Sequence, residues 1–252
     1  MSLLHTARFH TTVAQARQLP QTSVAEVAFI GRSNAGKSSA INVLCQRRRL
    51  AFSSRTPGRT QALNFYAVGR AEAIEAFLVD MPGYGYAAAP GAIRGGWDAL
   101  AGRYLQERRN LRGAVMMIDI RRLFTDLDRK MLAWLPPQVP LLVLLTKSDK
   151  FARAQQVQAE RLAVAELGRL RPGPAASVIL FSATARRGIE QAQAAIVAWL
   201  QPAVVPDSTA DAGAPDPETQ AGQKKPRPRG ESGYNALSSK APAQGGEAGV
   251  DP

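Results

Sequence analysis

Six short runs of mostly apolar residues recur between residues 24 and 181, and segments with helical spacing of apolar residues separate them. Several of the runs are rich in β-branched residues, as expected for buried strands. They cover Val24–Ile30, Leu63–Val68, Ala73–Val79, Ala114–Asp119, Val139–Leu145 and Ser177–Phe181. The helical segments cover 38–46, 97–105, 127–134, 153–169 and 189–200. Strands that alternate with helices in this way predict an α/β fold with a doubly wound sheet.

The second and third runs are separated only by Gly69–Glu72, which predicts a hairpin. We therefore expect a six-stranded, mostly parallel sheet with one antiparallel strand and with helices on both faces. In such sheets ligands bind at the carboxyl ends of the strands. Polar motifs that directly follow a strand are therefore the first candidates for a functional site.

The two ends of the chain lack this alternation of strands and helices. Residues 1–23 form an arm that ends at Leu19-Pro20, with one or two helical turns near Val13, Ala16 and Arg17. Residues 203–252 are rich in Pro, Gly and Ala and have almost no large apolar side chain, which predicts a disordered tail. The expected division is an arm (1–23), a folded domain (24–202) and a tail (203–252).

The formal net charge of +12 is unevenly spread. Residues 203–252 contain five Lys or Arg and seven Asp or Glu, so they carry −2 and residues 1–202 carry +14. A folded domain this basic attracts polyanions, and binding to nucleic acid would release counterions. The alternative is a solvated basic face, because scattered arginines are common on protein surfaces.

The composition excludes several classes of chemistry. Cys45 is the only cysteine, which excludes an intrachain disulfide and a four-cysteine metal site and favours a reducing compartment. His5 and His10 are the only histidines and both lie in the arm, so Ser-His-Asp, Cys-His and histidine-metal sites are not expected in the domain. The longest apolar runs are too short to span a membrane.

The first predicted strand ends in Gly31–Ser38, which reads G-x-x-x-x-G-K-S. Glycines allow the backbone to curl so that N–H groups point at phosphate oxygens, and the helix that follows adds the positive end of its dipole. Lys37 would reach the β- and γ-phosphates, and the Ser38 hydroxyl would bind Mg²⁺. The alternative is a glycine turn that happens to carry a lysine. The strand before the motif and the helix after it favour a P-loop NTPase fold.

Three other strand exits carry polar motifs. Asp80–Gly83 reads D-x-x-G, in which a carboxylate can hold a Mg²⁺-bound water and a glycine N–H can contact a γ-phosphate. In Thr146–Asp149 the carboxylate of Asp149 can accept both donors on the edge of guanine, a pair that adenine lacks, which predicts GTP rather than ATP. The stem of Lys147 would pack along the base, and the Ala183 N–H is available for the guanine oxygen. Each motif alone could be an ordinary strand exit, so their convergence carries the prediction.

Together the motifs resemble the five signatures of translation-factor-type GTPases. The strings GRSNAGKSS, TPGRTQ, DMPGYGYA, TKSD and FSAT are specifically similar to the EngB (YihA/YsxC) family of bacterial GTP-binding proteins, within the TrmE-Era-EngA-EngB-septin-like P-loop GTPases. The similarity covers roughly residues 5–200. It implies a cytoplasmic, Mg²⁺-dependent GTPase of the cell cycle that is needed for cell division and septation. It also implies a role in ribosome biogenesis, at assembly of the large ribosomal subunit.

The resemblance also assigns the site residue by residue. Thr60 is the second side-chain Mg²⁺ ligand beside Ser38, with Thr56 as the alternative, and Asp80 binds the ion through water. The expected catalytic residues are Lys37, Thr60, Gly83 and Asn34. The expected nucleotide contacts are Gly31, Arg32, Ser33, Asn34, Ala35, Gly36, Lys37, Ser38, Gly58, Arg59, Thr60, Gln61, Ala62, Asp80, Met81, Pro82, Gly83, Thr146, Lys147, Ser148, Asp149, Phe181, Ser182 and Ala183.

Tyr84 follows Gly83, where many signalling GTPases place a glutamine that orients the attacking water. A tyrosine cannot act in the same way, so we expect slow intrinsic turnover. Asn34 resembles the asparagine with which some related GTPases bind K⁺ near the phosphates, where the cation would stabilise charge. The alternative is that Asn34 only caps the loop.

Two functional hypotheses remain open. In the first, the protein is a GTP-hydrolysing switch whose basic face docks on ribosomal RNA or the large ribosomal subunit, while residues 50–62 and 83–96 reorder. In the second, it is a nucleotide-gated interaction module that acts directly on the division machinery. A small-molecule phosphotransferase is disfavoured, because no acceptor pocket is evident. We expect a monomer that does not read DNA sequence.

Overall fold

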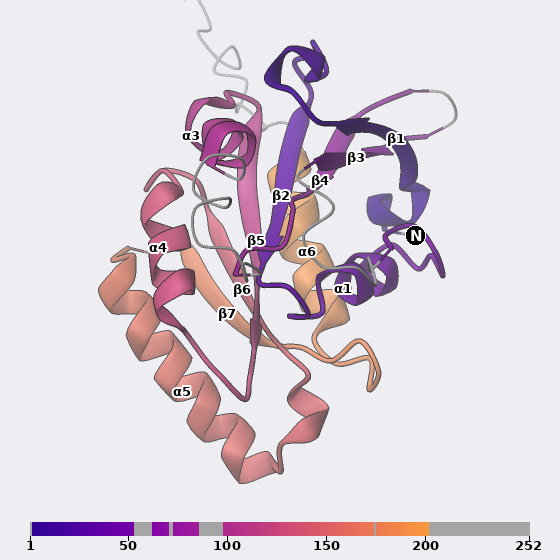
Figure 1. Cartoon of the computed structure of the whole chain (residues 1–252). Coiled ribbons are helices and arrows are strands. Elements are labelled where there is room, and N and C mark those ends of the chain that lie inside the picture. Colours follow the sequence, from indigo (N-terminus) through magenta and orange to yellow (C-terminus); the bar gives the residue numbers. More distant parts are fainter. Residues whose placement is uncertain (1, 53–61, 71–72, 86–97, 174, 202–252) are drawn as a thin grey trace, which may run out of the picture. The chain divides into compact units, whose positions relative to one another are not determined.

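The computed structural model describes residues 2–52, 62–70, 73–85, 98–173 and 175–201. By its contacts the chain divides into two units, Met1–Val204 and Val205–Pro252, and the second unit lies outside the described residues. The expected disordered tail therefore stays a prediction. The described part of the first unit is built around one sheet (Figure 1).

The elements follow one another along the chain much as the apolar pattern predicts. The strands are β1 (Arg8–Val13), β2 (Ala25–Gly31), β3 (Leu63–Val68), β4 (Ala76–Asp80), β5 (Leu111–Asp119), β6 (Leu141–Thr146) and β7 (Ala176–Leu180). The α-helices are α1 (Lys37–Leu44), α3 (Arg103–Glu107), α4 (Asp126–Trp134), α5 (Arg153–Leu170) and α6 (Ile189–Leu200). Shorter turns are η1 (Leu3–Thr6), η2 (Ala16–Gln18), the π-helical turn η3 (Asp98–Gly102) and η4 (Ser148–Lys150).

The strands lie in the order β1-β3-β4-β2-β5-β6-β7. β3 runs antiparallel to both of its neighbours, whereas the other pairs are parallel, so the predicted α/β class and the single antiparallel strand are confirmed. The predicted strand count of six is wrong, because part of the arm adds a seventh strand at the edge. β1 pairs with β3, with Arg8 opposite Ala67 and Val13 opposite Leu63. The helical turns expected in the arm are limited to the 3₁₀ turns η1 and η2.

Helices cover both faces of the sheet, as predicted (Figure 1). Successive residues of a strand point to opposite faces, so Ala28 and Ile30 of β2 join one core cluster and Val27 and Phe29 join the other. The first cluster takes side chains from α3, α4 and α5. The second takes side chains from η1, α1 and α6. β2 lies at the centre of both clusters, and all four of these side chains have no solvent exposure.

A buried charge lies at the amino end of β2. Glu26 has no solvent exposure and accepts hydrogen bonds from Tyr104 Oη at 2.8 Å and from Arg108 Nη2 at 2.5 Å. Arg108 Nη2 also donates to the carbonyl oxygen of Pro20 at 2.7 Å. This contact set, which we call the Glu26 hub, ties the end of α3 and the arm to the centre of the sheet.

The described helices include none that is both long and apolar enough to cross a membrane. α5, the longest at 18 residues, carries charged side chains along its length.

Candidate functional site

The loop between β2 and α1 has the backbone that a phosphate-binding loop requires. Asn34 and Gly36 both lie in the left-handed region, with φ of 65° and 94°. Glycine adopts this conformation without a steric penalty, which explains the residue type at position 36. α1 begins at Lys37, directly after this turn. The free N–H groups of its first turn therefore lie next to the loop, where they can bind an anion.

Lys37 and Asp80 meet at the carboxyl edge of the sheet. Lys37 Nζ donates to Asp80 Oδ1, and both side chains are largely buried. Burial raises the pKa of Asp80, and the opposite charge of Lys37 only partly offsets this effect. The lysine of the loop and the acid at the end of β4 thus form one charge-compensated pair. When a nucleotide binds, the lysine could pair with a phosphate and the acid with a cation.

The D-x-x-G segment packs directly on the phosphate-binding loop. Ser33 N donates to the carbonyl oxygen of Tyr84 at 3.1 Å. A Cβ atom at Gly83 would lie 3.0 Å from Ser33 Oγ and 3.1 Å from Ser33 N, so a larger residue would push the two segments apart. Gly83 therefore lets the exit of β4 approach the loop closely.

The Tyr84 side chain is directed to α4. Its hydroxyl donates to Asp128 Oδ1 at 2.6 Å, and only 7% of the residue is exposed. The other oxygen of Asp128 accepts from Thr125 N and Thr125 Oγ1, which caps the start of α4. Burial and the nearby Asp128 carboxylate raise the pKa of Tyr84 well above its ordinary value.

The exit of β6 is bonded to the same loop. Thr146 Oγ1 lies 2.6 Å from the carbonyl oxygen of Ala35, and Lys147 Nζ donates to the carbonyl oxygen of Asn34 at 2.7 Å. Lys147 itself has a φ of 59°, an uncommon conformation for a residue with a side chain. The T-K-x-D motif thus holds the phosphate-binding loop as well as the predicted base site.

Asp149 is joined to the exit of β7. Ser182 Oγ donates to Asp149 Oδ1 at 2.6 Å, and this hydrogen bond lowers the pKa of Asp149. Ser182 Oγ also accepts from Ala185 N at 2.9 Å, so the serine orients both the carboxylate and the loop that carries Ala183. Asp149 is therefore kept ionised, as an acceptor for two donors must be.

Asp119, the last residue of β5, belongs to this site although the sequence reasoning did not assign it a role. Its carboxylate accepts from Lys147 Nζ at 2.9 Å and from Arg121 Nε and Nη2 at 2.9 and 2.6 Å. Burial alone would raise the pKa of Asp119, but the hydrogen bonds from Arg121 and Lys147 lower it far below its ordinary value. The sequence does hold a signal for this role, because Asp119 is an acidic residue at the end of a predicted buried strand.

The structure thus brings the predicted residues of four strand exits together at one edge. Some of the predicted contacts have buried side chains: Met81 and Phe181 are each 1% exposed, so only their backbones can face a ligand. Ala62 lies directly before β3. The predicted residues Gly58, Arg59, Thr60 and Gln61, with the alternative Thr56, lie outside the described residues.

The donor set at this edge fits Mg²⁺. Ser38 in the first turn of α1 offers a hydroxyl, and Asp80 offers a carboxylate, and oxygen donors are the ligands that Mg²⁺ prefers. In the described part of the chain, no three His, Cys, Asp or Glu side chains gather in a way that could hold a metal ion. Mg²⁺ is commonly bound by one or two protein oxygens together with phosphate oxygens and water, so a larger cluster of acidic side chains is not needed.

Known proteins match the chain over most of its length. Residues 26–147 match a family described as 50S ribosome-binding GTPase. A relative from Ralstonia nicotianae, named "Probable GTP-binding protein EngB", is 48% identical over 241 residues, which cover 92% of this chain and 100% of the relative. A relative of the same name from Paraburkholderia phytofirmans is 50% identical over 204 residues, which cover 79% of this chain and 94% of the relative.

A solved structure has the same fold. The crystal structure of a probable GTP-binding protein engB aligns with a TM-score of 0.51 and 19% sequence identity, over 70% of this chain and 98% of that one. The sequence relatives and the residues gathered at the strand exits lead to one conclusion. The chain belongs to the EngB family of GTP-binding proteins, a family of P-loop GTPases that bind GTP and GDP, typically with Mg²⁺.

Proposed function

We propose that the protein is a cytoplasmic, Mg²⁺-dependent GTPase with slow intrinsic turnover. We further propose that it acts as a switch in assembly of the large ribosomal subunit and is thereby needed for division and septation. One observation carries the nucleotide part of the proposal. The phosphate-binding loop is hydrogen-bonded to Asp80 and Tyr84 on one side and to Thr146 and Lys147 of the T-K-x-D segment on the other. A single guanosine triphosphate can therefore touch the loop and both neighbouring segments.

Each residue has a role that its surroundings support. The backbone N–H groups of 31–38 and the Lys37 ammonium would bind the β- and γ-phosphates. Asp149, held by Ser182, would select guanine through its two adjacent donors. Ser38 and Thr60 would bind Mg²⁺ directly and Asp80 through water, and the ion would neutralise phosphate charge. The Gly83 N–H would contact the γ-phosphate, and the remaining predicted contacts would line the nucleotide.

Slow turnover is supported by the environment of Tyr84. Its hydroxyl is bonded to Asp128 and its side chain is buried, so it is not available to orient an attacking water. A K⁺ ion held by Asn34 would supply part of the missing charge stabilisation. Asn34 is exposed and its carbonyl is fixed by Lys147, which supports a role at the loop surface. Hydrolysis rates that are equal in K⁺ and in Na⁺, with and without ribosomal particles, would exclude the K⁺ role.

The nucleotide assignment is tested by calorimetry. The wild-type protein should bind GDP and GTP with Mg²⁺ and bind ATP far more weakly. Asp149→Asn should lose affinity for guanine nucleotides and gain affinity for xanthine nucleotides, because the amide offers the donor that the second carbonyl of xanthine needs. A wild-type titration without heat from either guanine nucleotide would refute the proposal.

The ribosomal part rests on the basic body of the chain and on the 50S ribosome-binding family that residues 26–147 match. Co-sedimentation with large subunits should require GTP and should weaken as salt rises. Co-sedimentation that is absent in every nucleotide state, together with GTP-dependent binding to division proteins, would favour the alternative of a direct interaction module.

A further inference from the structure

The first part of the chain is rich in basic residues and poor in acidic ones. Residues 1–71 contain ten Lys or Arg and only one acid, Glu26. Glu26 has no solvent exposure and is paired with Arg108, so it adds no negative charge to the surface. Residues 2–52 and 62–70 therefore contribute basic side chains and no acidic ones to the surface.

The densest group of these charges follows α1. Arg47, Arg48 and Arg49 are consecutive and exposed. Arg47 donates to the carbonyl oxygen of His5 at 3.1 Å, and none of the three forms an ion pair within the described residues. We call residues 47–52 the arginine turn.

Hydrogen bonds from Asn42 fix the backbone of the arginine turn, whereas its three arginines form no ion pair within the described residues. Asn42 Oδ1 accepts from Leu50 N at 2.9 Å and from Ala51 N at 2.8 Å, and Asn42 Nδ2 donates to the carbonyl oxygen of Ala51. Ala51 is 3% exposed and belongs to the core cluster under α1 and α6. A fixed backbone lowers the entropic cost when the side chains bind a partner.

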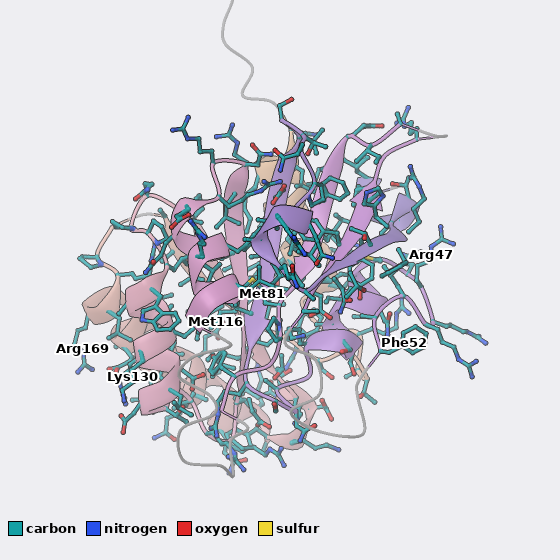
Figure 2. The ribbon with its side chains drawn as sticks, turned by 45° about the horizontal axis from the view of Figure 1, so that its top comes forward. Arg47, Phe52, Met81, Met116, Lys130 and Arg169 are labelled. Atoms are coloured by element: carbon teal, nitrogen blue, oxygen red, sulfur yellow. The ribbon has the colours of Figure 1, made fainter. Side chains whose placement is uncertain are left out.

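An aromatic ring stands at the end of the arginine turn. Phe52 is 72% exposed, the largest exposure among the large apolar side chains of the described residues. Figure 2 shows Arg47 and Phe52 projecting from one side of the molecule, away from Lys130 and Arg169 on the other side. Exposed aromatic rings next to arginines are the combination with which proteins bind unpaired RNA, because bases stack on the ring while arginines contact phosphates.

We propose that the arginine turn is an RNA-docking surface, in which Arg47, Arg48 and Arg49 contact phosphates and Phe52 stacks on an unpaired base. This inference rests on the proposed ribosomal function and assigns its contact surface. Phe52 directly precedes residues 53–61, which contain the expected Mg²⁺ ligand Thr60. Contact at Phe52 is therefore adjacent in sequence to the segment expected to sense the nucleotide.

The test compares two triple variants that remove the same charge. Arg47→Gln/Arg48→Gln/Arg49→Gln changes the arginine turn, and Arg153→Gln/Arg161→Gln/Arg169→Gln changes three exposed arginines of α5 as the control. Binding of the full chain, loaded with a non-hydrolysable GTP analogue, is measured against intact large subunits and against protein-free large-subunit RNA over a series of salt concentrations. Both variants should keep the wild-type affinity for GTP and the wild-type melting temperature, which establishes that they fold.

We expect the variant of the arginine turn to bind RNA at least about tenfold more weakly and to lower the slope of log affinity against log salt by about two to three. The α5 variant should bind like the wild type. Phe52→Ala should weaken binding by between about 5-fold and 150-fold, whereas Phe52→Trp should retain it, because only the tryptophan preserves a ring for stacking.

The outcomes separate this inference from the proposed function. If the wild type binds subunits and both triple variants bind equally well, the arginine turn is not the surface, although the ribosomal function stands. If the variant of the arginine turn loses binding to subunits but keeps binding to protein-free RNA, the surface contacts a protein and the RNA assignment is wrong. If the wild type binds neither subunits nor RNA while still binding GTP, the ribosomal proposal fails as well.

Discussion

Breaking the Glu26 hub should destabilise the fold strongly without changing the nucleotide site. Glu26 has no solvent exposure and the Arg108 side chain is 14% exposed. Arg108→Met would therefore leave a buried carboxylate that keeps the hydrogen bond from Tyr104 Oη but has lost its counter-charge. Removing one partner of a buried ion pair costs about 3–5 kcal/mol. For a domain of this size each kcal/mol lowers the melting temperature by about 2–4 °C, so we expect a decrease of about 6–20 °C.

The sharper test is a second substitution that removes the orphaned charge. In Glu26→Gln/Arg108→Met the amide oxygen can still accept from Tyr104, and no buried charge remains without a counter-charge. The double variant should therefore be more stable than Arg108→Met alone. Both variants lose the contact from Arg108 to Pro20, so this contact does not affect the comparison.

Urea unfolding of the wild type, Glu26→Gln, Arg108→Met and the double variant measures these differences. A double variant that is less stable than Arg108→Met would refute the reasoning, as would a cost below about 1 kcal/mol for Arg108→Met. GTP affinity provides an internal control. Glu26 and Gly31 are five residues apart on β2, about 17 Å at the usual rise of a strand, so nucleotide binding should be unchanged.

Three further predictions concern single side chains, two at the site and one at the far end of α1. Asp119→Asn should weaken GTP binding by releasing Lys147. The pKa of Asp119 is lower in the folded state than its ordinary value of 3.8. The ionised side chain therefore stabilises the fold at pH values above 3.8, and this contribution is lost as the pH falls. The stability difference between wild type and Asp119→Asn should thus be constant above about pH 5 and should shrink below about pH 4 in urea unfolding; a difference that grows as the pH falls would contradict this. Tyr84→Phe should lower stability by about 1–3 kcal/mol by removing a donor from buried Asp128, but should leave the rate of GTP hydrolysis within about twofold in a single-turnover assay; a large rate loss would show that the hydroxyl takes part in the reaction. Burial raises the pKa of the Cys45 thiol to about 12, so a thiol reagent at pH 8 should react only as fast as the fold opens, and rapid labelling of the native protein would contradict the buried position.

The central strands and the motifs that follow them could be predicted from the sequence, because both leave local patterns. A strand buried on both faces is a continuous apolar run, and observed bounds differ from the predicted ones by only a few residues, as in Ala76–Asp80 against the expected Ala73–Val79. The contacts of Asp80 and Lys147 with the phosphate-binding loop, and of Ser182 with Asp149 beside it, follow from the parallel strand order. Topology alone therefore places most of the candidate site.

The parts that were missed depend on contacts between distant segments. β1 lies at the edge of the sheet, and only Val13 among its residues is buried, so its sequence shows no alternation of apolar and polar positions. Glu26 and Arg108 are separated by 82 positions, and no local pattern pairs them. Asp119 looks like an ordinary strand end until the fold brings Lys147 beside it.

The edge position of β1 limits how far the chain can be shortened from its amino end. A fragment that begins at residue 24 would lack Leu4 and Val13, both fully inaccessible to solvent, and would leave holes in each of the two core layers. It would also expose the unpaired backbone of β3, to which another copy could add a strand and start aggregation. Insolubility of such a fragment would then report a missing piece of sheet, and would say nothing about the GTPase chemistry.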